Sequence, residues 1–84
     1  MAVPYARLEK LVAEGTVHRS HKGVLEVLLK RKLINETHLG DRVSGIIDTV
    51  LGTKAELGVV DVSKLREHEL KLLASEIKLA GTSH

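Results

Sequence analysis

The stretch Ile34-Asn35-Glu36-Thr37-His38-Leu39 sets the pattern of this chain, and Val60-Asp61-Val62-Ser63-Lys64-Leu65 repeats it. Each stretch has an apolar residue, then Asn or Asp, then three other residues and a Leu. The Asn or Asp side chain can accept hydrogen bonds from the first free N–H groups of a helix. The apolar residue before it can pack against the Leu as a hydrophobic staple. The two stretches therefore predict two helix starts in an all-helical fold.

Apolar residues at helical spacing predict the first two helices. The first runs from Pro4 to Glu14 and ends at Gly15, which can adopt a left-handed conformation. The second runs from about His21 to Leu33, with Ser20 as its preferred cap and Thr16 as the alternative, and carries its cations in the last turn, where they favour the negative helix end.

The third helix begins after Asn35 and reaches Gly52, or continues for one more turn. The fourth follows Asp61 and runs to about Ala80, with Gly81 as its terminator. The fold predicted for residues 1–84 is thus a single all-α domain, a small irregular bundle of about four helices. A variant with residues 53–57 as a separate turn is the alternative.

Composition limits how this bundle can be stabilised. The chain has 84 residues and no Cys, Phe or Trp, so Leu, Val and Ile must form the core and disulfides are excluded. A chain this short buries only roughly 60% of its unfolded surface, which favours reinforcement by oligomerisation. The lack of Cys fits a reducing compartment, and we predict a cytoplasmic location. No apolar run exceeds three residues, which predicts no membrane span and no signal peptide.

The fourth helix carries two apolar stripes when its residues are placed at about 100° intervals. One stripe consists of Leu65, Leu72 and Leu79, and the other of Leu70, Leu73, Ile77 and Ala80. Two acids, Glu69 and Glu76, project between them. We predict that one stripe packs inside the monomer and the other against a second copy, in a homodimer. The predicted interface residues are Leu65, Glu69, Leu72, Glu76 and Leu79. Alternatively, the helix is central and both stripes are buried within one chain.

The basic side chains of the second helix region could contact phosphates or a protein partner. Residues 16–34 hold five Lys or Arg side chains against the single acid Glu26, a local charge of +4 in a chain of net charge +2. The candidate contacts are Arg19, Lys22, Lys30, Arg31 and Lys32. Reading of the major groove by the third helix is disfavoured, because its polar face carries Asp41 and Asp48 and only one cation, Arg42.

The histidines predict no metal centre and the chain predicts no catalysis. The pair His18 and His21 falls in a connector, and nothing fixes His38 and Asp41 beside it, so solvated histidines are expected. No nucleophile–base–acid order or glycine-rich phosphate loop is present, and we expect neither a cofactor nor an enzyme. The leading hypothesis is a non-enzymatic regulator or adaptor that self-associates and binds another macromolecule, preferably a protein. The alternative is a nucleic-acid-binding protein that contacts phosphates through the basic residues of the second helix.

Overall fold

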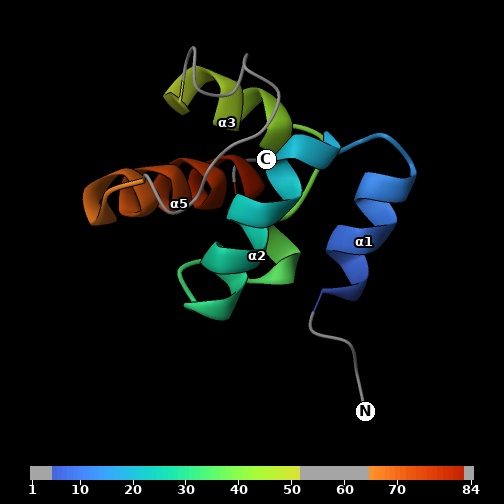
Figure 1. Ribbon diagram of the computed structural model, residues 1–84, viewed down its shortest axis with the longest axis horizontal. Helices are drawn as coiled ribbons and strands as arrows, with labels where there is room; N and C mark the ends of the chain where they lie inside the picture. The colour runs from blue at the N-terminus through green and yellow to red at the C-terminus, as the bar shows by residue number, and fades with distance from the viewer. Residues whose placement is uncertain (1–4, 52–64, 83–84) are drawn as a thin grey trace.

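Four α-helices and two short 3-10 helices make up the described residues, 5–51 and 65–82, of the computed structural model (Figure 1). The α-helices are α1 (Ala6–Ala13), α2 (Lys22–Lys30), α3 (Val43–Leu51) and α5 (Glu67–Thr82). The 3-10 helices are η1 (Arg19–His21) and η2 (Glu36–His38). No strand occurs within these ranges. The predicted all-α fold is therefore confirmed, whereas Pro4 and the Val60–Asp61 junction lie outside the described residues.

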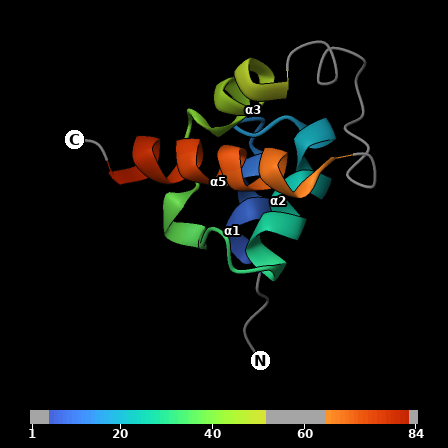
Figure 2. The same ribbon diagram turned by 90° about the vertical axis from the view of Figure 1, so that its left-hand side faces the viewer.

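The core is aliphatic, as the composition requires, and all four described α-helices contribute to it. Helix α1 packs beside α2, and α5 packs against both α3 and η2. Figure 2 shows α5 crossing one side of the bundle, between α3 and η2. The buried side chains are Leu8, Leu11, Val17, Val24, Leu25, Leu28, Ile34, Leu39, Val43, Ile47, Leu51, Leu70, Leu73, Ala74 and Ile77.

Helix α1 ends as the sequence predicts, at a glycine. Gly15 has a φ of +80°, in the left-handed region. Its N–H donates to the carbonyl of Val12 at 3.1 Å, and the N–H of Thr16 donates to that of Leu11 at 2.9 Å. These two bonds form a Schellman motif, which satisfies the last carbonyls of the helix.

Helix α2 ends by the same motif, but earlier than predicted and without a glycine. The N–H of Lys32 donates to the carbonyl of Leu29 at 3.0 Å, and that of Leu33 donates to Leu28 at 3.0 Å. Lys32 occupies the left-handed position, with a φ of 59°. The predicted end at Leu33 is therefore wrong, because the chain reverses at Lys32. Of the three consecutive cations, only Lys30 lies in the last turn.

Three further helix limits differ from the prediction. Ser20 does not cap α2; the His18 side chain instead accepts the Ser20 N–H and starts η1, which leads directly into α2. Asn35 does act as a capping residue, but it starts η2, whereas α3 begins only at Val43. Helix α5 continues through Gly81 to Thr82, so a glycine alone does not end it.

Arg7 ties α1 to the turn that follows α2. Its Nε and Nη2 both donate to the carbonyl of Leu39, at 3.1 and 3.0 Å, and its backbone N–H donates to Glu36 Oε2 at 2.8 Å. The same arginine thus holds η2, against which α5 packs.

Candidate interaction surfaces

The two apolar stripes of the last helix have different environments. Leu70, Leu73 and Ile77 are buried in the core, whereas Leu72 and Leu79 are 51% and 63% exposed. Leu72 and Leu79 are the large apolar side chains that are exposed among the described residues. The alternative in which both stripes are buried within one chain is therefore wrong.

We call the exposed side of this helix the outer face of α5. It consists of His68, Lys71, Leu72, Ser75, Glu76 and Leu79, all of them exposed. Successive residues of a helix are about 100° apart, which places Lys71 on one side of the leucines and Glu76 on the other. The outer face therefore combines an apolar ridge with charges of opposite sign along its two edges.

Two of the five predicted interface residues do not belong to the exposed ridge. Leu65 precedes the helix and packs, partly buried, against the core. Glu69 is partly buried, and its Oε1 accepts the N–H of Arg66 at 3.1 Å at the start of the helix. Leu72, Glu76 and Leu79 lie on the outer face, and their role in an interface stays a prediction. The seven-residue spacing of the leucines can be read from the sequence. The sequence does not reveal that Leu65 lies before the first residue of the helix.

The five predicted phosphate contacts fall into two groups at opposite ends of α2. Arg19 and Lys22 lie at its beginning, and Lys30 to Lys32 lie at its end. A nine-residue helix is about 13 Å long, so these groups do not form one site. The single basic segment predicted from the sequence is therefore two separate groups of cations in the structure.

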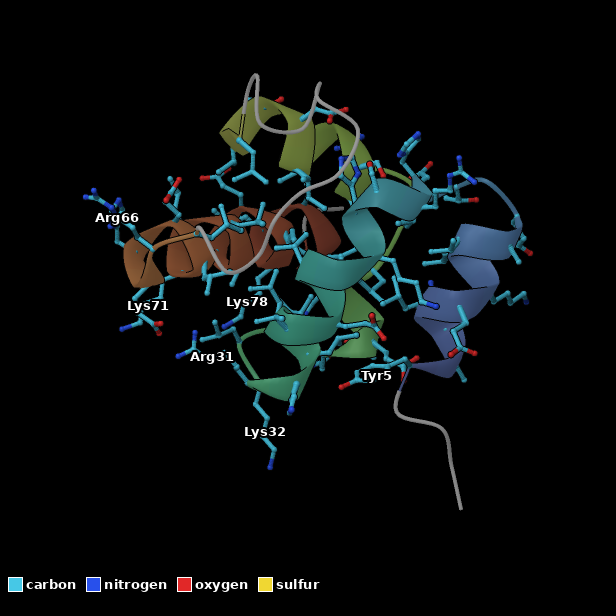
Figure 3. The ribbon with its side chains drawn as sticks, in the orientation of Figure 1. Tyr5, Arg31, Lys32, Arg66, Lys71 and Lys78 are labelled. Atoms are coloured by element: carbon cyan, nitrogen blue, oxygen red, sulfur yellow. The ribbon has the colours of Figure 1, made fainter. Side chains whose placement is uncertain are left out.

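The second group is extended by side chains that the sequence did not assign to it. Lys78 of α5 lines the same groove as Lys30 and Lys32. Figure 3 shows Lys71 and Lys78 on the side of α5 toward Arg31. Arg31 Nη1 lies 2.7 Å from Glu67 Oε2, and this ion pair joins the end of α2 to the beginning of α5. We call this set the basic edge: Lys30, Arg31, Lys32, Lys71 and Lys78.

A groove of about 850 Å³ lies beside the basic edge. Its apolar lining includes Tyr5, Leu29 and Leu33, and Lys30 and Lys32 line it as well. Lys32 is there in a left-handed conformation, which costs a residue with a side chain roughly 1 kcal/mol relative to Gly. The backbone reversal at the end of α2 therefore sets the direction of the Lys32 side chain.

A histidine network lies at the other end of α2, between η1 and α3. His21 is only 2% exposed. Its Nδ1 lies 3.0 Å from Ser44 Oγ and its Nε2 lies 3.2 Å from Asp48 Oδ1. The Ser44 hydroxyl also accepts the backbone N–H of His18 at 2.9 Å. The expectation of a solvated side chain is therefore wrong for His21.

One protonation state gives every group in the network a partner. A neutral ring with its proton on Nε2 donates to Asp48 and accepts the Ser44 hydroxyl proton at Nδ1. Burial lowers the pKa of His21 below its ordinary value of 6.5; Asp48 partly opposes this, and His18 adds to the lowering. The contacts of His21 with Ser44 and Asp48 therefore join η1 to α3, and we call these contacts the clamp.

Neither a metal centre nor a membrane-spanning helix occurs within the described residues. No three His, Cys, Asp or Glu side chains of residues 5–51 and 65–82 gather to hold a metal ion. None of the helices in these ranges is long and apolar enough to cross a membrane. Comparisons with protein-family models, with curated proteins and with solved structures found no match to this chain.

Proposed function

We propose that this chain is a non-enzymatic helical interaction module that self-associates through the outer face of α5 and binds another macromolecule. The observation that carries the proposal is the exposure of Leu72 and Leu79. A regulator or adaptor of this size gains stability from a second copy, because its own core is small. The cysteine-free chain fits a cytoplasmic setting, and that location stays a prediction.

The energetics favour a weak dimer over a permanent one. Two copies bury four leucine side chains that are about half exposed in the monomer. This burial contributes roughly 3–6 kcal/mol in total. Association itself costs at least about 4 kcal/mol in lost translational and rotational freedom. We therefore expect self-association that depends on concentration and on the charges at the edges of the seam.

Sedimentation equilibrium over a range of protein concentrations tests the proposal. The wild-type chain should associate, and Leu72→Asp should weaken association by about 2 kcal/mol, or roughly thirtyfold in the dissociation constant. Ala13→Asp is the matched control, because it adds the same charge at an exposed site on α1. Circular dichroism confirms that both variants are folded. A wild-type chain that stays monomeric at high micromolar concentration would contradict the proposal.

Nucleic-acid binding is the second candidate, and the basic edge favours it. The Arg31–Glu67 ion pair joins the end of α2 to the beginning of α5, and Lys78 of α5 shares a groove with Lys30 and Lys32. Phosphate contacts by Lys and Arg give binding that weakens steeply as salt rises. The other end of α2, with Arg19 and Lys22, would be a separate and smaller contact.

A salt series with a short duplex and a single strand separates the candidates. If phosphates bind at the basic edge, Lys30→Gln with Lys32→Gln should flatten the salt dependence by about one unit for each phosphate that is no longer neutralised. Lys22→Gln at the opposite end of α2 is the control and should change it less. The absence of binding by the wild-type chain at low salt excludes this candidate, whereas sedimentation tests the first one independently.

A further inference from the structure

The outer face of α5 follows a heptad pattern in which each edge of the leucine ridge has one sign of charge. With the exposed leucines at heptad position a, the cations fall at g, the acids at e and small or polar residues at d. The assignments are Leu72 and Leu79 at a, His68 and Ser75 at d, Lys71 and Lys78 at g, and Glu69 and Glu76 at e.

The positions on the opposite side of this heptad are those that the monomer already buries. Leu70 and Ile77 fall at position f and Leu73 at position b, and all three lie in the core. In a coiled coil, position f points away from the partner helix. The helix can therefore present positions a, d, e and g to a second copy while its inner face stays in its own core.

We propose that two copies associate with their α5 helices parallel, so that Lys71 of one protomer faces the partner's Glu76. This inference rests on the self-association proposed above and adds the orientation of the partner. In parallel helices, position g meets the position e that lies five residues further along the partner, and Lys71 and Glu76 have this spacing. Two-fold symmetry forms the pair twice.

The antiparallel alternative brings like charges together. Its edges would place position g against g and position e against e, so that Lys71 approaches a lysine and Glu76 approaches a glutamate. Both Lys71 and Glu76 are exposed. Within residues 5–51 and 65–82, neither takes part in an ion pair. Charge complementarity thus selects the parallel arrangement.

Charge-reversal variants should change the dissociation constant in opposite directions for a parallel and an antiparallel dimer. In a parallel dimer, Lys71→Glu replaces two attractions by two repulsions and should raise the dissociation constant by about tenfold at low salt. The exchange of both charges, Lys71→Glu with Glu76→Lys, should restore wild-type association. Lys10→Glu, at an exposed position on α1, controls for the change in net charge. An antiparallel dimer would instead be strengthened by Lys71→Glu.

Single cysteines report the orientation independently, because the chain contains none. In a parallel pair, residues at position d lie beside their own copies, so His68→Cys and Ser75→Cys should each form a disulfide-linked dimer under mild oxidation. In an antiparallel pair that crosses near Ser75, two copies of residue 68 lie far apart. Lys10→Cys measures cross-linking by random collision.

The outcomes distinguish this inference from the one on which it rests. Weakening by Lys71→Glu, rescue by the double exchange and cross-linking of His68→Cys support the parallel dimer. If the wild-type chain associates but Lys71→Glu strengthens association, or His68→Cys cross-links no more than Lys10→Cys, the orientation is overturned and self-association stands. If the wild-type chain does not associate, both proposals are overturned.

Discussion

Two turns of this bundle have the same local form but different attachments. In the first, His18 caps η1 and the third residue of the turn is His21; in the second, Asn35 caps η2 and the third residue is His38. The imidazole of His38 turns back on its own loop, and its Nδ1 accepts the N–H of Asn35 at 3.1 Å. The His21 ring instead reaches Ser44 and Asp48 of α3. Equivalent positions thus serve local capping in one turn and long-range attachment in the other.

The difference follows from what lies beside each turn. Next to η1, the first turns of α3 offer a hydroxyl and a carboxylate, while the surrounding core excludes water from the His21 ring. The η2 turn lies at the surface, where His38 is partly exposed and Asn35 is exposed. We therefore expect equivalent substitutions in the two turns to change the free energy of unfolding by different amounts.

The largest difference is expected between His21→Ala and His38→Ala. Removal of the His21 ring leaves a buried cavity and deprives Ser44 of a partner, so we expect a loss of about 2–4 kcal/mol. The corresponding loss for His38→Ala is about 1 kcal/mol or less, because water can replace its local bond. Urea unfolding followed by circular dichroism measures both values. Equal losses would show that the clamp has no energetic role.

A smaller loss is expected when the middle of the clamp is removed. Ser44→Ala leaves the His18 N–H and His21 Nδ1 without their partner, which should destabilise the fold by about 1–2 kcal/mol after allowance for the higher helix propensity of Ala. Thr49→Ala removes a hydroxyl at an exposed site on the same helix, where it donates to the carbonyl of Gly45, and should shift the urea midpoint less. If the two variants unfold alike, the Ser44 hydroxyl is dispensable.

The Asn35 cap should matter less than the clamp. Asn35→Ala removes the acceptor for the Thr37 N–H, a bond of 2.9 Å, and should cost about 0.5–1 kcal/mol. Asn35→Asp keeps an acceptor oxygen at the same place and should remain close to the wild type. An unchanged midpoint for Asn35→Ala would mean that the capping box of η2 contributes nothing measurable.

The features that the sequence predicts well depend on residues close together in the chain. The Asn35 cap and the Gly15 helix end each use bonds within a few residues, and glycine is the usual residue at a left-handed position. Lys32 forms the same kind of helix end, but its side chain gives no such signal. The buried and exposed stripes of α5 can be predicted from the sequence, because the spacing of residues along a helix fixes the side on which each side chain lies.

Two of the missed features depend on partners that are distant in sequence. His21 could not be assigned to the core, because the residues that satisfy its nitrogens belong to α3. Lys78 could not be placed beside Lys30, because only the packing of α5 brings them to one groove. The sequence also predicts too early a start for α3, because a good capping residue does not reveal whether a full helix or a single 3-10 turn follows it.

The smallest and most specific effect should be on the pH dependence of stability. Burial lowers the pKa of His21 below 6.5, but Asp48 offsets part of that change, so the effect should be smaller than the loss of the ring. A histidine whose pKa is lower in the folded than in the unfolded state contributes stability that is complete above the unfolded pKa. That stability is lost as the pH falls from the unfolded toward the folded pKa, because the unfolded chain then binds more protons.

Urea midpoints of the wild type should therefore decline between about pH 7.5 and pH 5 more than those of His21→Gln, a variant that keeps a polar side chain but does not titrate there. Both proteins keep the other four histidines, so the difference between them reports on His21 and its coupling to His18. A difference that stays constant across this range, or that grows in favour of the wild type as the pH falls, would show that burial of the ring does not govern its protonation.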